Sequence, residues 1–596
     1  GDKITNRAAA KGVIASPVPD HLMPHGPDGK PYEVLLNPLG IISRTNVAVL
    51  AETALAKIAR KTGKPYVLPT FRDDDLVEYS LNELKKHGIP ETETLTDPKT
   101  GRKIPNIFTG EQYFLKLHHM ADDKWSARDT GSYTMDDAPA PGSVGQSKRM
   151  SGLEVAALIS HGATGILRDK LVRGQRSDAY WQALRMGVQP KIPTESVAYS
   201  KFLNLIKAAG VSVRDHQTGI QVLPMTRKDV KETVGDRFHT SGDAIQLHGE
   251  KVVPGGLFDV SLTGGHQGNR WTGVRLHSPV PNPALEVPLQ NLLGLTGPAY
   301  RELLGTEDGI RKVTDSLRRI SVPKAIEENL QVLKSGKTSA RDRALKNLRT
   351  LRTMEKEGFT PEDLLLDTTP VRPPTSTPVP RVNGMELTSD ANLLYKDMWE
   401  ANENLKAAKE AGIAGPDEHL ALYDSVKAVF GLGDSINPKN REKNVGGMLV
   451  HVFGKSSPKF SFFQRKLLSH TVDSVSRGVI TPDQNLDMDS VGIPEDMAWN
   501  MYRPYIMRRL ARKYNLGASS KVPLTELAQW VINRDDRAKR EMEAEMSERP
   551  ILYSRAPVWH KYGIIGAWPK LVPGNTIRLS PLNTPGLGAD FDGNCT

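Results

Sequence analysis

The 596-residue sequence has a single cysteine, Cys595, one position before its last residue. One thiol cannot form a disulfide within the chain, and it cannot supply a cysteine-rich zinc site. The sequence also lacks an apolar run long enough to span a bilayer, and its first residues lack the apolar core of a signal peptide. These absences argue against secreted and membrane-spanning classes, and we expect a cytoplasmic protein that carries no zinc.

Length and charge narrow the class further. A chain of 65.6 kDa is too long for a single compact core, so several domains are expected. Hydrophobic residues make up 38% and charged residues 25% of the sequence, as in a globular protein. The net charge of +10 suits a polyanionic partner such as nucleic acid, although a basic protein without such a partner has the same balance.

Apolar periodicity predicts several helices, one group of which is strongly basic. Residues 298–360 have a helical and basic pattern. The cations between residues 334 and 356 fit a solvated helix face at least as well as a dedicated DNA contact. They are Lys334, Lys337, Arg341, Arg343, Lys346, Arg349, Arg352 and Lys356. The other predicted helices cover residues 45–62, 151–165, 388–412, 416–431, 494–515 and 523–547.

Strands and loops are predicted elsewhere. Residues 33–36 form a strand-like apolar run, and residues 215–300 combine short strands with loops rich in glycine and proline. The prolines of residues 368–380 block helix and favour an extended link. The last fifty residues alternate short β runs with turn residues, as in a small barrel.

The segment at 588–594, GADFDGN, carries the most specific chemistry. Its oxygen-bearing residues Asp590, Asp592 and Asn594 alternate, and a glycine lets the loop turn, so these groups can converge on one hard cation. Mg²⁺ takes few carboxylates and keeps positions open for phosphates. A surface turn has the same composition. An EF-hand loop is excluded because its sixth position holds Cys595 instead of glycine.

The residues upstream of this loop make the motif specific. Residues 555–564 read RAPVWHKYGI, and residues 569–582 read PKLVPGNTIRLSPL. Together with the acidic loop they resemble the β′ subunit of RNA polymerase, where N-R-A-P-T-L-H-R-x-G-I precedes N-A-D-F-D-G-D at this distance. The resemblance implies that Asp590 and Asp592 hold a catalytic Mg²⁺ in a two-metal mechanism, and that Arg555 recognises the ribose of the incoming nucleotide.

Three departures from the β′ pattern affect the expected chemistry. Asn594 stands where the family has a third aspartate, so an oxygen ligand is kept and a negative charge is lost, which weakens Mg²⁺ binding. Gly588 replaces an asparagine that contacts a sugar. Residues 469–471, SHT, replace a G-K-R, which removes two positive charges and predicts a weaker grip on phosphate.

The first thirteen residues, GDKITNRAAAKGV, resemble the β-subunit segment G-D-K-x-x-x-R-x-x-x-K-G-V. The resemblance implies that Lys3 and Lys11 reach the RNA 3′ end and the nucleotide phosphates, and that Arg44 contacts the triphosphate. Cations that neutralise phosphate charge suit an in-line displacement. Further β-like segments follow at 36–46, 115–133 and 148–163, and in the family this region lines the path of the DNA and the RNA–DNA hybrid.

The middle of the chain resembles the start of β′. Residues 255–289 match it without the cysteines of the bacterial zinc module, residues 360–374 match the lid region, and residues 463–480 match a strand and loop that contact template DNA. His118 and His119 near Asp122 suggest a metal site less strongly than hybrid contact or packing, because no third ligand set is evident. The expected nucleic-acid contacts are Arg7, Lys116, His119, Lys124, Arg128, Lys148, Arg149, Arg465, Lys466 and Arg477.

The resemblance implies an α+β multidomain fold with a double-psi β-barrel polymerase core, a helical clamp and hybrid-binding segments. Residues 1–165 would form the β-like C-terminal region, with part of the barrel and the hybrid-binding segment. Residues 166–250 would form a β clamp or connector. Residues 251–450 would form the β′-like N-terminal clamp, lid and helices, and residues 451–596 the β′-like barrel with the metal loop.

The expected function is DNA-templated RNA synthesis by nucleotidyl transfer to the RNA 3′ end. The expected partners are template DNA, the RNA transcript, nucleoside triphosphates, and other polymerase subunits or fragments that carry the bridge helix and trigger loop. Direct β–β′ fusion without the zinc module resembles polymerases of bacteriophages and mobile elements, so the location would be a bacterial host's cytoplasm or a virion.

Two alternatives stay open. Asn594 also suits a nucleic-acid-binding scaffold on the polymerase fold without catalysis. The chain could also belong to the two-barrel RNA-templated polymerases, although the β-like and β′-like flanking segments argue against this. Every version with catalysis requires that the two ends of the chain share one cleft for phosphates.

Overall fold

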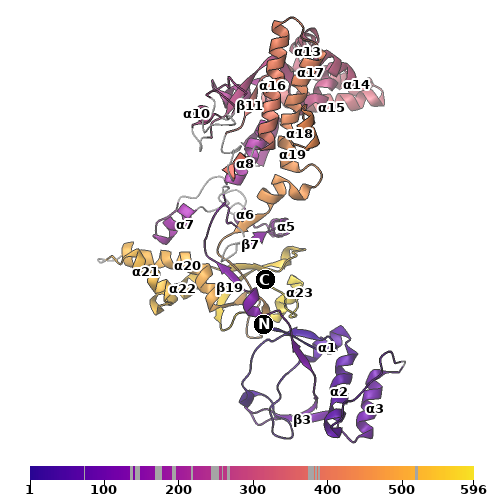
Figure 1. Ribbon diagram of the computed structural model, residues 1–596, viewed down its shortest axis with the longest axis vertical. Coiled ribbons are helices and arrows are strands. Elements are labelled where there is room, and N and C mark those ends of the chain that lie inside the picture. The colour runs from indigo at the N-terminus through magenta and orange to yellow at the C-terminus, as the bar shows by residue number, and fades with distance from the viewer. Residues whose placement is uncertain are drawn as a thin grey trace. The chain divides into compact units, whose positions relative to one another are not determined.

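The computed structural model describes residues 1–72, 74–134, 138–140, 148–167, 178–190, 196–216, 219–242, 254–257, 259–264, 269–373, 381–382, 385–386, 389–516 and 521–596. The chain forms two compact units of mixed α and β structure (Figure 1). Residues 1–194 and 470–596 make the first unit, and residues 195–469 make the second. The expected first and last domains therefore contribute to the same unit. Within the described residues, no helix combines the length and the apolar character needed to cross a bilayer.

The N-terminal part of the first unit is a small sheet with a helical pair beside it. β1 (Lys3–Asn6) lies between β2 (Lys11–Val13) and β5 (Phe114–Lys116), and both pairings are antiparallel. The predicted helix at 45–62 is confirmed as α2 (Val47–Thr62), which packs its apolar face on α3 (Leu76–Lys86). The predicted strand at 33–36 is wrong: these residues are exposed coil, followed by α1 (Pro38–Arg44).

The C-terminal part of the first unit is built on a five-stranded sheet and three helices. The strand order is β16-β20-β17-β19-β18, with parallel pairing of β16 to β20 and of β17 to β19. The predicted helix at 494–515 is α20 (Glu495–Ala511), and its buried residues form the core against this sheet. The strands are β16 (Ile480–Pro482), β17 (Ser490–Pro494), β18 (Ile551–Ser554), β19 (Ile564–Val572) and β20 (Ile577–Leu579).

One helix predicted in this part is two helices. The range 523–547 contains α21 (Leu524–Ile532) and α22 (Asp536–Glu548). Arg534 between them has a positive φ of 53°, and the Asp535 carboxylate caps α22 by accepting from the Arg537 amide. A left-handed residue followed by an aspartate cap ends one helix and starts the next. The predicted helix at 151–165 likewise divides at Gly162 into α5 (Gly152–Ser160) and α6 (Thr164–Leu167).

Strands from the two ends of the chain pair with one another. β6 (Ser126–Arg128) pairs with β15 (Val475–Arg477), and β7 (Lys148–Met150) pairs with β14 (His470–Val472). These pairings join the β-like and β′-like segments within the first unit. The remaining elements of this unit are β3 (Thr92–Thr96), β4 (Lys103–Phe108), α4 (Ala121–Lys124), α7 (Asp178–Arg185) and α23 (Thr584–Leu587).

The second unit is mostly helical and contains one long pair of antiparallel strands that are far apart in the sequence. β10 (Thr272–Pro281) pairs with β11 (Leu365–Val371), so residues 215–300 contain a longer strand than predicted. The extended link predicted at 368–380 is extended through residue 371, and residues 374–380 lie outside the described residues. The predicted helices at 388–412 and 416–431 are confirmed as α16 (Asp390–Glu410) and α17 (Pro416–Phe430).

The basic region at 298–360 is helical, as predicted. It comprises α12 (Gly297–Leu304), α13 (Glu307–Arg319), α14 (Val322–Ser335) and α15 (Thr338–Glu357). Buried residues of these helices form a core with Leu364 and Leu365. The other elements are α8 (Val197–Ala208), β8 (Val211–His216), β9 (Gly219–Pro224), α9 (Arg227–Val234), α10 (Val260–Thr263), α11 (Glu286–Leu293), β12 (Arg381–Val382), β13 (Met385–Glu386), α18 (Pro438–Glu442), α19 (Met448–Phe453) and the π-helical turn Phe463–Leu468.

Candidate active site

The acidic loop follows α23 at the C-terminal end of the first unit. Gly588 ends α23 with a left-handed φ of 57°, and Gly593 turns the loop with a φ of 106°. The Ile480 amide donates to the Asn594 carbonyl at 3.0 Å, which attaches the end of the loop to β16. The Val13 amide donates to the Phe591 carbonyl at 3.4 Å. The loop is thus attached both to the C-terminal sheet and to the N-terminal hairpin.

The hairpin β1–β2 places two lysines beside this loop. Lys11 lies opposite Thr5, and Thr5 lies two positions after Lys3, so both lysines lie on the same face. Lys3 Nζ is 3.9 Å and Lys11 Nζ is 3.4 Å from Asp592 Oδ2. The Lys3 side chain also passes Gly593, where an added Cβ would lie 3.4 Å from Lys3 Nζ. Glycine at this position leaves room for the ammonium group.

Two arginines also lie beside the acidic loop. Arg44, the last residue of α1, places a guanidinium nitrogen 3.7 Å from Asp590 Oδ2 and donates to the Lys11 carbonyl at 3.3 Å. Arg555 follows β18 directly and donates from Nε to Asn594 Oδ1 at 2.8 Å. The six residues expected to be catalytic, together with Asn594, therefore form one cluster.

Electrostatics in the loop reflect two carboxyl groups held close together. Burial and the hydrogen bond with Asp592 raise the pKa of Asp590, although Arg44 and Arg555 oppose the rise. Burial acts in the same direction on Asp592, but the hydrogen bond from Asp590 and the charges of Lys3 and Lys11 hold its pKa below the usual value. Converging carboxylates surrounded by cations are suited to a divalent ion and phosphates.

The donor set fits one Mg²⁺ with two protein carboxylates. In the described part of the chain, no group of three acidic, histidine or cysteine side chains could hold a metal. Asn594 donates its amide to Asp592 Oδ1 at 3.0 Å and also to Asp590 Oδ1, so in this orientation it braces the two aspartates. Its oxygen would become a ligand only if the amide turned over.

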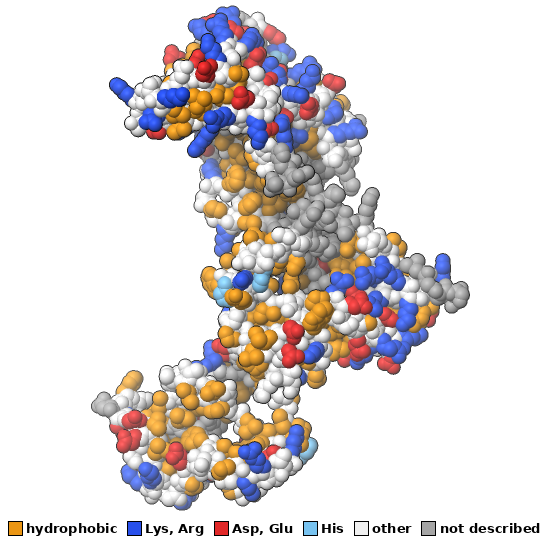
Figure 2. Space-filling model, turned by 180° about the vertical axis from the view of Figure 1, so that it is seen from behind, with side chains coloured by type: hydrophobic (Ala, Val, Ile, Leu, Met, Phe, Trp, Pro, Cys, Tyr) orange, Lys and Arg blue, Asp and Glu red, His pale blue; other side chains and the backbone are white. Residues whose placement is uncertain are grey.

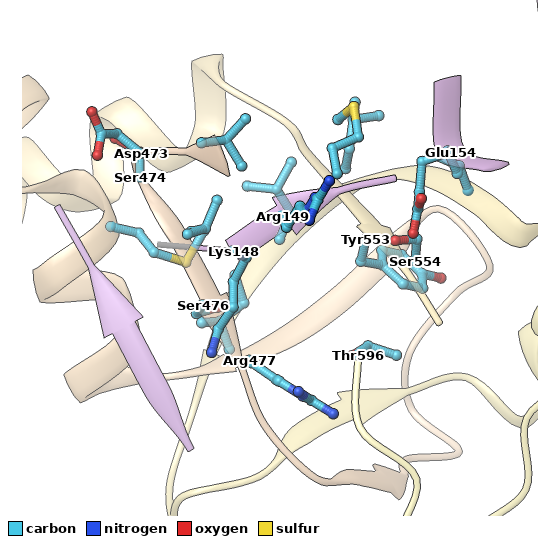
Figure 3. A pocket seen from close by; sticks show the side chains of 18 of the residues that line it. Lys148, Arg149, Glu154, Asp473, Ser474, Ser476, Arg477, Tyr553, Ser554 and Thr596 are labelled. Atoms are coloured by element: carbon cyan, nitrogen blue, oxygen red, sulfur yellow. The ribbon is translucent and has the colours of Figure 1, made fainter. Parts of the chain in front are cut away.

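A second group of expected contacts lines a cavity of about 660 Å³ in the same unit. Lys148 and Arg149 lie on β7, and Arg477 lies on β15. Figure 3 shows the Lys148 and Arg477 side chains extending toward the same side of the cavity, where Thr596 also lies. Burial and the neighbouring charge of Arg477 lower the pKa of Lys148. Cations from segments more than 300 positions apart therefore share one cavity.

The structure corrects the expected role of Arg128 as a nucleic-acid contact. Its side chain is 1% exposed, and its Nε lies 2.8 Å from Asp473 Oδ1. Tyr133 and Trp181 also donate to Asp473, at 2.6 and 3.1 Å. A guanidinium buried in such a network cannot reach a phosphate, so Arg128 has a structural role. Asp473 and Trp181 were not identified from the sequence, because their partners lie hundreds of positions away.

The remaining expected contacts are on the surface. Arg7 lies over the Tyr113 ring and 3.5 Å from Glu52, and Lys116 lies 3.7 Å from Asp2. His119 is exposed, and Lys124 is half-buried at the end of α4. Arg465 and Lys466 lie on the π-helical turn of the second unit, Arg465 exposed and Lys466 half-buried.

Comparison with known proteins matches the N-terminal and C-terminal segments of the chain to two different family models. Residues 1–139 match the family model of RNA polymerase Rpb2, domain 6, and residues 469–595 match that of RNA polymerase Rpb1, domain 2. The chain belongs to the multisubunit RNA polymerase family. It joins a segment like the C-terminal region of β to a segment like the N-terminal region of β′.

Curated bacterial proteins show the same relationship. The "DNA-directed RNA polymerase subunit beta'" of Acholeplasma laidlawii is 31% identical over 306 residues, which cover 50% of this chain and 21% of the relative. The proteins of the same name from Bacillus thuringiensis and Bacillus anthracis are 31% identical over 312 residues, 50% of this chain and 25% of theirs. The matched part thus spans a quarter or less of these relatives.

Proposed function

We propose that the chain supplies the catalytic portion of a DNA-directed RNA polymerase, which transfers nucleotides from nucleoside triphosphates to the RNA 3′ end on a DNA template. The convergence of Lys3, Lys11 and Arg44 on the acidic loop carries this proposal. Segments from opposite ends of the chain bring together carboxylates for a metal and cations for phosphates. Nucleotidyl transfer needs both sets of groups in one place.

The cations have defined tasks in this reaction. Lys11 and Arg44, with half-exposed side chains, can exchange their aspartate partners for the oxygens of the triphosphate. Lys3 is 14% exposed and stays beside Gly593, where it can hold the RNA 3′ end. Arg555 follows β18 beside the loop and can meet the ribose. Positioned cations stabilise the charge that develops on the transferred phosphoryl group.

Asp590 and Asp592 would hold one Mg²⁺, with Asn594 as a third oxygen donor after its amide turns over. When bound, this ion lowers the pKa of the RNA 3′ hydroxyl and stabilises charge on the α-phosphate, and a second ion would arrive with the nucleotide in a two-metal mechanism. Lys148, Arg149 and Arg477 in the cavity would contact the template or the hybrid, together with the surface residues Arg7, Lys116, His119, Lys124, Arg465 and Lys466.

The wider assignments are part of the same proposal. The five-stranded sheet and the N-terminal hairpin would belong to double-psi β-barrels, and the helices of the second unit to the clamp. Other polymerase subunits or segments would supply the bridge helix and trigger loop, and the enzyme would act in the cytoplasm. A bacteriophage-type enzyme stays a prediction from the sequence, and the named relatives are bacterial subunits.

A non-catalytic scaffold is the second candidate, and one observation favours it. The Asn594 amide donates to both aspartates, which reduces their charge available to a metal. Both candidates predict binding of an RNA–DNA hybrid, but only the polymerase extends the RNA.

Primer extension separates the candidates. The chain, reconstituted with subunits that supply the rest of a polymerase core, is tested on an RNA–DNA scaffold with Mg²⁺. We expect Asp592→Ala to lower the rate at least about a hundredfold. Asp487→Ala, which removes an exposed carboxylate of the same unit, should leave it unchanged. Extension that survives Asp592→Ala contradicts the catalytic assignment, and hybrid binding without extension by the unaltered chain supports the scaffold.

A further inference from the structure

Arg555 lies beside two carboxylates but is hydrogen-bonded to a neutral amide. Its Nε donates to Asn594 Oδ1 at 2.8 Å. Among the residues that the structure describes, no carboxylate lies within 4.0 Å of its guanidinium nitrogens. The two aspartates of the acidic loop are instead engaged by Arg44 and by the lysines of the β1–β2 hairpin. The residue in the third position of the loop therefore holds this arginine.

The hydrogen bonds around Asn594 fix the direction in which its amide faces. The amide nitrogen donates to Asp592 Oδ1 at 3.0 Å, to the Asp590 carbonyl at 2.9 Å and also to Asp590 Oδ1. The amide oxygen accepts from Arg555. Arginine has only donors and an ionised carboxylate has only acceptors, so each side of the amide meets its complement. The amide oxygen thus faces Arg555, and the amide nitrogen faces the two carboxylates that are expected to bind Mg²⁺.

The opposite orientation of this amide is unfavourable on both of its sides. It sets two donors against each other at Arg555 Nε, and it sets two acceptors against each other at the aspartates. A divalent cation between the amide oxygen and the carboxylates removes the second conflict, because all three oxygens are then ligands. The first conflict is removed only when Arg555 leaves the amide for another acceptor. Metal ligation by Asn594 therefore requires the release of Arg555.

The surroundings of Arg555 leave room for this movement. Gly588 lies beside the guanidinium, and a Cβ added at this glycine would lie 3.8 Å from Arg555 Nη1. In the described part of the chain, no heavy atom beyond the adjoining residues lies closer to that position. The left-handed φ of 57° at Gly588 also disfavours a side chain there. The space beside the guanidinium is therefore open.

We propose that Asn594 couples the metal site to Arg555: its amide holds the arginine in the metal-free state and releases it when the amide oxygen becomes a metal ligand. The inference rests on the proposed polymerase function, in which the released guanidinium meets the ribose of the nucleotide. Ribose recognition then follows metal binding. By linkage, an acceptor that takes Arg555 away from the amide strengthens metal binding by the same factor. Asn594 is a positioning residue in this scheme, since it acts on the nucleotide through Arg555.

Binding of Mn²⁺ to the full chain, followed by electron paramagnetic resonance, tests the coupling without any need for activity. Arg555→Met removes the donor to the amide and leaves a long side chain in its place. Arg44→Met is the charge-matched control, because it removes one positive charge next to Asp590. Burial raises the pKa of Asp590, and the charge of Arg44 opposes this rise more strongly than that of Arg555. If charge alone mattered, Arg44→Met would strengthen Mn²⁺ binding at least as much as Arg555→Met.

The coupling predicts the reverse order for the two arginine variants. We expect Arg555→Met to lower the Mn²⁺ dissociation constant about tenfold, because turning the amide no longer breaks a hydrogen bond from a charged donor. Arg44→Met should lower it about threefold or less, since the charge that it removes is partly exposed. Circular dichroism checks that both variants keep their helix content. Equal gains, or a larger gain from Arg44→Met, would overturn the proposal.

Asn594→Asp supplies the second part of the test. A carboxylate presents an oxygen on both sides, so it can keep Arg555 and bind the metal without turning over. In the Asn594→Asp background, Arg555→Met should therefore strengthen Mn²⁺ binding no more than Arg44→Met does. This loss of additivity measures the coupling. A gain of about tenfold that persists in this background shows that the amide is not the coupling element.

Asp592→Ala separates this inference from the function on which it rests. Figure 2 shows acidic side chains spread over the surface, and these give a weak background of Mn²⁺ binding that Asp592→Ala retains. If Asp592→Ala loses the tight binding and the two arginine variants behave alike, the coupling is refuted and the metal assignment stands. If Asp592→Ala keeps the tight binding, the acidic loop is not the metal site, and both the coupling and the catalytic proposal are refuted.

Discussion

Asn594 is the residue on which the strength of the metal site depends. The loop brings two carboxylates together, and the third position offers an amide that donates to both. We expect Asn594→Asp to lower the divalent-ion concentration needed for half-saturation by about tenfold, because a third negative charge is added at a partly exposed site. Mn²⁺ binding followed by electron paramagnetic resonance measures this change without any need for activity.

The control for this substitution adds the same charge away from the loop. Asn485→Asp lies on an exposed turn of the same unit and should leave Mn²⁺ affinity unchanged. If Asn594→Asp binds Mn²⁺ no better than the unaltered chain, residue 594 does not belong to the metal site. Position 594 would then only brace the two aspartates.

We expect the removal of the Asp473 carboxylate to lower the stability of the first unit strongly. It accepts from Arg128, Tyr133 and Trp181, and its side chain is 5% exposed. Asp473→Ala leaves the Arg128 guanidinium buried without its counter-charge, which costs about 3–5 kcal/mol in the free energy of unfolding. Urea denaturation followed by tryptophan fluorescence gives the measurement.

An exposed ion pair is the proper comparison for Asp473. Asp308 holds Arg311 and Lys312 on the surface of α13, so Asp308→Ala should leave the free energy of unfolding nearly unchanged. A similar small cost for Asp473→Ala would show that Arg128 finds another partner or solvent. Arg128 could then again be considered as a contact for nucleic acid.

Sequence reasoning succeeded at single residues where a motif fixed the chemistry and failed where the surroundings decided it. Lys3, Lys11, Arg44 and Arg555 were predicted to face the acidic loop, and the structure places them there. Arg128 lies in a segment with the same family resemblance, but it is buried against Asp473, 345 positions away. Composition and spacing contain no signal for such a distant partner.

At the scale of elements, the pairing of α20 with α22 makes stability depend on pH. Glu541 lies between Arg509 and Lys513, whose nitrogens are 3.0 and 2.7 Å from its carboxylate oxygens. Burial raises the pKa of Glu541, but the hydrogen bonds from Lys513 and Arg509 outweigh it, so the pKa is lower than the ordinary value of 4.5. A lowered pKa contributes stability above the unfolded-state value, and this contribution is lost as the pH falls through the folded-state value.

Glu541→Gln should therefore reduce stability at neutral pH by roughly 1–3 kcal/mol and flatten the loss of stability below about pH 4.5. Thermal unfolding at a series of pH values from 7 down to 3 tests both effects. Glu543→Gln, an exposed glutamate on the same helix, should leave the profile unchanged. A Glu541→Gln profile parallel to that of the unaltered chain would contradict the linkage.

Elements were predicted well where periodicity was long and poorly where a cap or a partner decided the outcome. The apolar spacing of residues 390–410 and 416–430 was sufficient to predict both helices, since each helix buries one continuous face. The break at Arg534 depends on one left-handed residue and the Asp535 cap. The apolar run at 33–36 gave a false strand because the described residues around it offer no strand to pair with.

At the scale of the whole molecule, the decisive feature is that the first and last segments of the chain fold into one unit. The sequence-based hypothesis requires the two chain ends to share one cleft, and the structure brings the ends into contact through ion pairs between residues almost 600 positions apart. The local pattern of residues does not predict that the two chain ends meet. That expectation came from the order of the β-like and β′-like motifs. The four expected domains did not include a unit made from both ends of the chain.

A zero-length crosslink tests this arrangement in solution. Lys11 Nζ lies 3.4 Å from Asp592 Oδ2, so a carbodiimide should join the two side chains as an amide. Proteolysis and mass spectrometry should then find the N-terminal and C-terminal peptides linked. Lys11→Arg should abolish the amide at position 11, because a guanidinium does not form it, and should leave only a link from Lys3, which lies 3.9 Å from the same oxygen. Lys427 and Glu286, 2.5 Å apart in the second unit, provide the internal standard. If a sample contains the Lys427–Glu286 link but lacks the Lys11–Asp592 link, the two chain ends lie apart in solution. That result would remove the common cleft on which the polymerase proposal depends.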